Sequence, residues 1–182
     1  VVGAGPAGIV AADTLIKRGH KVDLYEKSGE IGGSVIPGSK PMIKYEFKNY
    51  LDYLKGVVAK LEKNESFKLF MNTAADAQSL KEKGYDSIVI AAGTVQNRPP
   101  VEGINNKNVV FAVDVLNDRN IVKDAEDIVV IGGGVVGAET AYVLRYELNK
   151  NVKVVEMDKY IMNHVCTANR GHLIHYLEEG GV

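Results

Sequence analysis

The chain has 182 residues, of which 46% are hydrophobic and 25% charged, a balance typical of a globular protein with one or two domains. Its formal net charge of −1 does not favour a nucleic acid or an anionic membrane surface as a partner. The single cysteine, Cys166, cannot form an internal disulfide. The sequence has no signal-peptide pattern and no apolar run of the roughly 18–20 residues that a membrane span requires. We therefore expect a cytoplasmic protein.

The first 26 residues have the pattern of a dinucleotide-binding unit. An apolar strand leads into Gly3-Ala4-Gly5-Pro6-Ala7-Gly8, and a helix is predicted from Pro6 to about Arg18. The next strand, residues 22–26, ends in Glu26, which follows Gly8 by 18 residues. Such a turn brings backbone N–H groups to a pyrophosphate at the positive end of a helix, and the acid accepts hydrogen bonds from ribose hydroxyls.

The middle of the chain predicts alternating helices and strands. Apolar residues recur at intervals of three and four over residues 42–63, which indicates an amphipathic helix. A strand is predicted at residues 67–71, a short helix at 75–83 and a buried strand at 86–92. Three tyrosines of the long helix are interpreted as packing residues: Tyr45, Tyr50 and Tyr53.

A linker is predicted at residues 97–103, because each proline disfavours a helical residue before it. A strand at residues 108–111 and a helical turn at 113–117 are expected to follow. The predicted domains are residues 1–105 and 106–182.

Residues 129–156 repeat the layout of the first unit. A β-branched strand leads into Gly132-Gly133-Gly134-Val135-Val136-Gly137, a helix is predicted to about Leu148, and a strand at 152–156 ends in Glu156. This acid follows Gly137 by 19 residues. A last helix is predicted over residues 169–179.

This repeat indicates an α/β protein with two dinucleotide-binding, Rossmann-like units, each built on a parallel sheet. A lone glycine pattern is often only a flexible turn, but here each copy also has its strand, helix and acid. Glu156 favours NADH over NADPH, because a carboxylate pairs with a free 2′-hydroxyl and repels a 2′-phosphate. Val1 lies only two residues before the glycine turn, which is short for a first strand, and Val182 follows the last helix where a next strand should begin. We therefore expect a segment of a longer protein.

The sequence resembles the flavin and pyridine-nucleotide reductases in three features. These are the order of the two glycine turns, the segment Ile31-Gly32-Gly33-Ser34 and the segment Ala91-Ala92-Gly93-Thr94. In that family a nicotinamide domain is inserted within a FAD domain. The resemblance implies that Gly33, Ser34, Ala92 and Gly93 contact FAD, and Glu139 matches an acid that the family often carries after the second turn.

The predicted site residues form two sets. Those for FAD are Gly3, Gly5, Pro6, Ala7, Gly8, Glu26, Lys27, Gly33, Ser34, Ala92 and Gly93. Those for NAD(H) are Gly132, Gly134, Val135, Val136, Gly137, Glu139 and Glu156. No catalytic side chain is predicted, because hydride transfer is chemistry of the cofactors. No metal site is predicted either, since the pairs His164 with Cys166 and His172 with His175 lack further ligands.

The subgroup follows partly from an absence. No cysteine occurs between Gly33 and Cys166, which excludes a thiol relay beside the flavin. The C-terminal module of old-yellow-enzyme-like 2-enoate and 2,4-dienoyl-CoA reductases has a similar segment to the one that precedes the long helix here, Pro37-Gly38-Ser39-Lys40-Pro41. That resemblance implies a parent enzyme with an upstream domain carrying FMN and an iron–sulfur cluster, neither of which this chain would hold.

The sequence therefore predicts a flavoprotein oxidoreductase module that transfers hydride from NADH to FAD. It would feed a parent enzyme of the enoate or dienoyl-CoA reductase type, or of the NADH oxidase type. The alternative is a non-catalytic nucleotide-binding module that senses redox state or has a structural role. A dehydrogenase of small substrates is disfavoured, because it would need one nucleotide unit and a catalytic domain.

Overall fold

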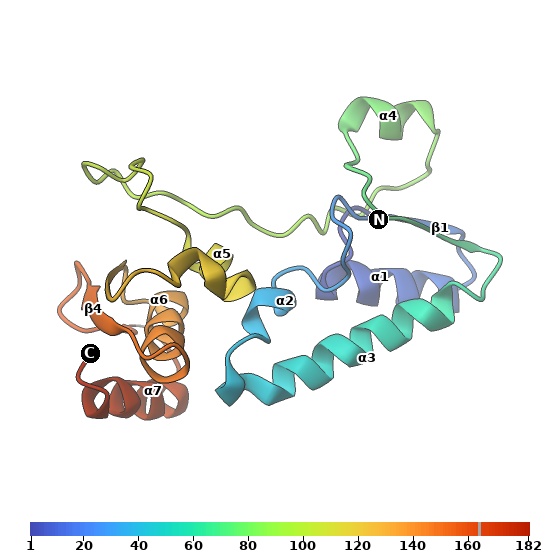
Figure 1. Cartoon of the computed structure of the whole chain (residues 1–182). Coiled ribbons are helices and arrows are strands. Elements are labelled where there is room, and N and C mark those ends of the chain that lie inside the picture. Colours follow the sequence, from blue (N-terminus) through green and yellow to red (C-terminus); the bar gives the residue numbers. More distant parts are fainter. Residues whose placement is uncertain (164) are drawn as a thin grey trace. The chain divides into compact units, whose positions relative to one another are not determined.

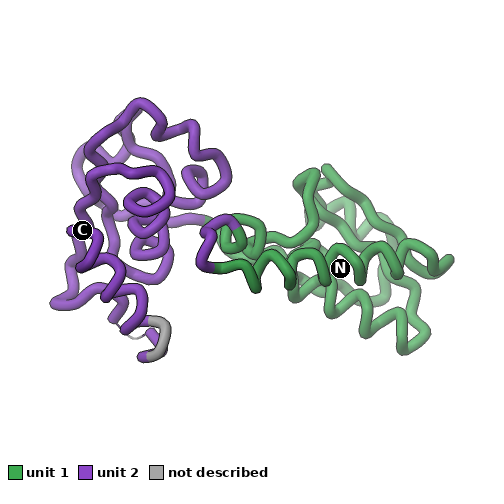
Figure 2. The backbone as a smooth tube through the Cα atoms, turned by 60° about the horizontal axis from the view of Figure 1, so that its bottom comes forward, with its two compact units in different colours: residues 1–39, 44–95 green, residues 40–43, 96–182 purple. Residues whose placement is uncertain are grey.

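A computed structural model describes residues 1–163 and 165–182, without the side chains of residues 168 and 169. The chain divides into two compact units, residues 1–39 with 44–95 and residues 40–43 with 96–182 (Figure 2). Both units are α/β with parallel strands, as the sequence predicts. Among the described residues, no helix has both the length and the apolar character that crossing a bilayer demands.

The first unit is built on parallel strands. Strand β1 (Val22–Tyr25) pairs in parallel with β2 (Phe67–Phe70) along its whole length. On its other side, Tyr25 bridges Val2, which in turn bridges Ile90, so the start of the chain lies between β1 and residues 89–91. This arrangement brings the first glycine turn to the carboxyl ends of neighbouring strands, where ligands bind in open α/β sheets.

Two helices cover this sheet. Helix α1 (Pro6–Lys17) packs against α3 (Tyr45–Leu61), the long helix in Figure 1. The buried residues of α3 recur every three or four positions and join Ile9, Ala12 and Leu24 in one core: Leu51, Leu54, Val58 and Leu61. Burying each such side chain contributes roughly 1.5–3 kcal/mol, so this stripe holds the helix in place. The short helices of the region are α2 (Val35–Gly38), η1 (Met42–Lys44) and α4 (Ala77–Glu82).

The amphipathic helix predicted at residues 42–63 is confirmed as α3, which begins at Tyr45 after the short η1. Two other predictions for the first unit are wrong. The tyrosines of α3 do not pack inside, because Tyr45 and Tyr53 are 66% and 62% exposed and Tyr50 is 40% exposed. The helix buries only its narrow aliphatic stripe, and the aromatic rings lie beside it. Residues 86–92 form a single bridge at Ile90, whose side chain is 79% exposed, so they are an edge rather than a buried strand.

The second unit is built on β3 (Asp127–Ile131) and β4 (Asn151–Val155), which pair in parallel. Helix α6 (Val135–Tyr142) connects them and continues as the π-helical segment η3 (Val143–Glu147). The other helices are α5 (Ala112–Asn117), η2 (Arg119–Val122) and α7 (Thr167–Glu179). One core unites them: Val115, Val122, Val130, Ala138, Ala141, Leu144, Val152, Met162, Leu173 and Leu177. The strand predicted at 108–111 is wrong, since these residues form a turn and irregular backbone before α5.

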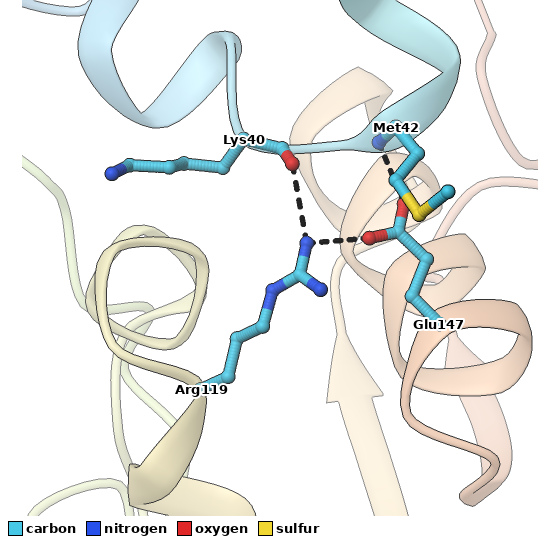
Figure 3. Close-up of polar contacts among 4 residues, drawn as sticks. All are labelled: Lys40, Met42, Arg119 and Glu147. Carbon is cyan, nitrogen blue, oxygen red and sulfur yellow. Dashed lines mark hydrogen bonds and ion pairs between the residues drawn. The ribbon is translucent and has the colours of Figure 1, made fainter.

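Residues 40–43 belong to the second unit although both their neighbours in sequence belong to the first. Figure 3 shows how they are held: the Arg119 guanidinium donates to the Lys40 carbonyl at 3.1 Å and pairs with Glu147. The other Glu147 oxygen accepts the backbone N–H of Met42 at 2.7 Å. Pro41, between the two bonded residues, is fully buried. The segment is thus anchored through its backbone and one proline ring.

Candidate functional site

Both glycine turns have one backbone shape. Gly3 has a φ of +101° and Gly132 a φ of +98°, in the region that favours glycine. A Cβ added at Gly8 would lie 1.8 Å from the Gly3 carbonyl oxygen, and one at Gly137 would lie 1.8 Å from the Gly132 carbonyl oxygen. The helix can therefore approach the turn this closely only because the last turn residue lacks a side chain, while the first turn residue supplies the positive φ.

Both turns end in a helix whose N-terminus is open. Gly5 and Gly134 are the N-cap residues of α1 and α6, and within the described part of the chain no side chain caps either helix. Neither helix has an acidic residue in its first turn. By contrast, α4 is capped by Asp76, which accepts the N–H groups of Gln78 and Ser79. The first-turn N–H groups of α1 and α6 are thus available to an external anion, at the positive end of each helix dipole.

Glu26 links the first turn to β1. Its Oε2 accepts the backbone N–H of Ala4 at 2.8 Å, and its Oε1 accepts the N–H and the hydroxyl of Ser28, both at 2.8 Å. Burial, with 8% of the residue exposed, acts to raise the pKa of Glu26. The hydrogen bonds from Ser28 and Ala4, with the charge of Lys27, outweigh burial and lower that pKa below its ordinary value. The group is therefore a carboxylate at neutral pH, able only to accept hydrogen bonds.

Glu156 has the same place in the second turn. Its Oε2 accepts the N–H of Gly133 at 2.6 Å, and its Oε1 accepts the N–H of Asp158 at 2.9 Å. These backbone hydrogen bonds, from Asp158 first and then Gly133, lower the pKa of Glu156. Each carboxylate has about four lone-pair sites, so oxygens that already bind backbone N–H groups can also accept ribose hydroxyls.

The backbone carbonyls of Ala4 and Gly133, whose N–H groups bind the two acids, also accept hydrogen bonds. Gly32 N–H donates to the Ala4 carbonyl at 2.9 Å, and Met162 N–H donates to the Gly133 carbonyl at 2.7 Å. Gly32 follows Glu26 by six residues, and Met162 follows Glu156 by six residues. The second residue of each glycine turn is therefore fixed at both its N–H and its C=O by equivalent partners.

These partners were not among the predicted site residues: Ser28, Gly32, Asp158 and Met162. All four donate backbone N–H groups, which the chemistry of the side chains does not reveal, and Ser28 also donates its hydroxyl. One signal could have found them, since an isoleucine follows each acid by five residues, Ile31 and Ile161. The internal repeat thus extends through residues 26–32 and 156–162.

Two further segments border the first turn. A Cβ added at Gly33 would lie 3.1 Å from the Cα of Gly5, and one at Gly3 would lie 2.4 Å from the Ala91 carbonyl oxygen. The structure therefore brings together the two segments expected to contact FAD. The remaining residues predicted there are all exposed on these segments: Ser34, Ala92 and Gly93. Their contacts with a cofactor stay a prediction.

The second turn has fewer neighbours. A Cβ at Gly133 would lie 2.6 Å from Cγ2 of Ile161, whereas a Cβ at Gly132 or Gly134 would meet no described atom within 4 Å. Predicted residues at the helix starts lie beside the turns, half-buried or exposed: Pro6, Ala7, Val135 and Val136. Glu139, half-buried, lies one turn further along α6.

The residues set aside as metal ligands lie away from both turns in sequence. His164 lies outside the described residues, and Cys166 is exposed. His175 lies 3.5 Å from Glu179 of the same helix. Across residues 1–163 and 165–182, no cluster of three or more His, Cys, Asp or Glu side chains has a geometry suited to a metal ion.

These features fit two dinucleotides. Each turn offers a side-chain-free cradle, open helix N–H groups for a phosphate and an ionised acid for a ribose. The first cradle is bordered by two extra backbone segments, and the second is more open.

Comparison with known proteins agrees with this geometry. The model of the pyridine nucleotide-disulphide oxidoreductase family matches residues 1–182. The chain is 36% identical over 177 residues to a cinnamate reductase of Clostridium sporogenes, covering 96% of this chain and 25% of the relative. It is 36% identical over 159 residues to an NADH oxidase of Thermoanaerobacter brockii, covering 86% and 24%.

Solved structures extend the likeness to three dimensions. A 2-naphthoyl-CoA reductase in complex with 2-naphthoyl-CoA superposes with a TM-score of 0.88 at 36% identity, covering 100% of this chain and 26% of that one. The chain spans about a quarter of the length of these relatives.

Proposed function

The chain belongs to the pyridine nucleotide-disulphide oxidoreductase family, and from that premise we propose that it binds FAD at the Gly3–Gly8 turn and NADH at the Gly132–Gly137 turn. Membership of the family implies binding of FAD and NAD(P)H. The duplicated clamp, in which Glu26 and Glu156 each hold a glycine turn, is the observation that carries the proposal. It supports two separate sites for nucleotides.

The borders of the turns support the assignment of FAD to the first. There Gly33 and Ala91 enclose the turn on two sides, which suits a cofactor that stays bound. Ile161, Met162 and Glu156 border the second turn, and a Cβ at Gly132 or Gly134 would meet no described atom within 4 Å, which suits a nucleotide that binds and leaves. NADH is proposed over NADPH because the carboxylate of Glu156, ionised at neutral pH, would repel a 2′-phosphate and accept a hydrogen bond from a free 2′-hydroxyl.

The role of this chain's own residues is to bind the two nucleotides and to orient them. The helix N-termini of α1 and α6 would hold the phosphates, and Glu26 and Glu156 would hold the ribose hydroxyls. When bound, NADH supplies a hydride and FAD accepts it, chemistry that needs no acid or base from the protein. The lack of a thiol in the first unit is consistent with this direct route.

The relatives support a place in a larger enzyme. We propose that the chain is the NADH-oxidising part of a 2-enoate reductase-type or NADH oxidase-type enzyme. Another part of such an enzyme, carrying FMN and an iron–sulfur cluster, would reduce the final acceptor. The names cinnamate reductase and 2-naphthoyl-CoA reductase point to an unsaturated acid or its CoA ester as that acceptor.

The proposal is tested by adding NADH without oxygen to the chain loaded with FAD. Bleaching of the yellow flavin absorbance supports it, and NAD⁺ at the same concentration is the control. Tight binding of both nucleotides without bleaching would instead support the non-catalytic alternative. Failure to bind either nucleotide would contradict both.

A further inference from the structure

Met162 directs the peptide group that follows Gly133. The Gly133 carbonyl and the Gly134 N–H belong to one peptide unit, which is planar and trans, so they point in opposite directions. Because Met162 N–H holds that carbonyl at 2.7 Å, the Gly134 N–H is directed away from Met162. Within the described residues this N–H has no hydrogen-bond partner.

The first turn has the same relationship. Gly32 N–H holds the Ala4 carbonyl at 2.9 Å, and the N–H of Gly5 shares its peptide unit with that carbonyl. The Gly5 N–H is likewise unpaired in the part of the chain that the structure describes. In both copies the unpaired N–H belongs to the N-cap residue of the helix at the turn.

We propose that Met162 is a positioning residue of the second nucleotide site. Its N–H fixes the Gly133–Gly134 peptide so that the Gly134 N–H faces a phosphate of a bound pyrophosphate. Gly32 has the equivalent role in the first site. This inference rests on the proposed function, because it assumes that the second turn binds a dinucleotide.

The backbone of Met162 supports a role beyond packing. Its φ of +54° lies in the left-handed region, where non-glycine residues are uncommon. Within residues 1–163 and 165–182 the other such residues are Asn72 and Asn149, whose side chains tolerate this conformation better. Met162 is held there by burial, with 2% of the residue exposed, and by its bond to Gly133. A strained backbone persists where surrounding contacts fix it, and such residues gather at ligand sites.

Two substitutions with isomeric side chains distinguish the effect of the backbone conformation at residue 162 from the effect of side-chain packing. Met162→Leu and Met162→Ile add side chains of equal size, but only isoleucine is β-branched and therefore strongly disfavoured at this φ. The isoleucine variant should shift the loop and release the Gly133 carbonyl. Binding of NADH and of adenosine, which lacks both phosphates, is measured for each variant by isothermal titration calorimetry or NMR.

We expect Met162→Ile to bind NADH about tenfold more weakly than Met162→Leu, with equal binding of adenosine. Equal binding of NADH by the two variants would overturn the inference, as would a parallel loss of adenosine binding. A failure of the unsubstituted chain to bind NADH would instead overturn the proposed function. Thermal unfolding of both variants checks that each is folded when binding is measured.

Discussion

The carboxylate of Glu156 accepts the backbone N–H of Gly133 at 2.6 Å, so the acid expected to bind a ribose also braces the turn expected to bind the phosphates. In the first turn the carboxylate of Glu26 likewise accepts the backbone N–H of Ala4 at 2.8 Å. Recognition of the two halves of a nucleotide is therefore coupled in each unit. Loss of either acid should weaken both contacts at once, beyond the loss of one ribose hydrogen bond.

The preference for NADH should depend on the charge of Glu156. We expect the unsubstituted chain to bind NADH more tightly than NADPH, and Glu156→Gln to reduce the ratio of the two affinities by roughly tenfold, because repulsion of the 2′-phosphate is removed. Dissociation constants for both cofactors test this. Glu65→Gln, at an exposed acid of the first unit, should leave the ratio unchanged. A ratio that Glu156→Gln does not alter would show that this carboxylate does not select the cofactor.

The stability contributed by Glu26 should be lost in acid. Its pKa is lowered in the folded chain, so the carboxylate stabilises the fold at any pH above the unfolded value of about 4.3. This contribution disappears as pH falls through the lower folded value. Urea unfolding of the chain and of Glu26→Gln should show a difference in unfolding free energy at pH 7 that narrows below about pH 4. A difference that stays constant down to pH 3 would contradict the assignment.

Close packing at the last glycine of each turn should make it intolerant of a methyl group. Gly137→Ala places a Cβ 1.8 Å from the Gly132 carbonyl oxygen, so we expect a loss of several kcal/mol, about the cost of severe overpacking. Gly56→Ala is the matched control, because a Cβ there meets no described atom within 4 Å on helix α3. It should stabilise the chain by about 0.5–1 kcal/mol. Thermal unfolding compares the two, and equal effects would be inconsistent with the turn geometry.

The anchoring of residues 40–43 should depend on Glu147. Its side chain is 4% exposed, so Glu147→Ala leaves the Met42 N–H without an acceptor and the Arg119 guanidinium without its ion-pair partner, and should cost about 3 kcal/mol. Met42→Ala removes only a side chain that is 74% exposed and should change stability by less than about 0.5 kcal/mol. Proteolysis should also cut near residue 40 faster in Glu147→Ala. Equal rates in both variants would mean that the backbone bonds do not anchor the segment.

The sequence predicts the parts of the fold that depend on local chemistry. Glycines at fixed spacing, the strand–helix–strand pattern and the acids correctly located both turns, and the structure places Gly33 and Ala91 beside the first. These features follow from steric and electrostatic requirements that act within a few residues. The family resemblance drawn from the same motifs is confirmed.

Features that depend on tertiary context were missed. Apolar composition does not distinguish an edge segment from a buried strand, so it predicts a buried strand at residues 86–92 where the structure has an exposed edge. The aromatic residues of α3 fit a helical period yet lie outside the stripe that packs on α1. Met162 and Gly32 contact the turns through backbone N–H groups, and the sequence does not show which backbone groups the fold brings to a turn.

The central claim is that each turn binds its own nucleotide, and the most direct measurement is the binding of FAD and NADH to Gly8→Ala and Gly137→Ala in parallel. Both substitutions place a Cβ 1.8 Å from a turn carbonyl oxygen, so they perturb the two turns equally. We predict that Gly8→Ala loses FAD and keeps its binding of NADH, while Gly137→Ala loses NADH and keeps FAD. If either folded variant lost binding of both nucleotides, the claim of two separate sites would be contradicted. It would also be contradicted if both variants kept binding of both nucleotides.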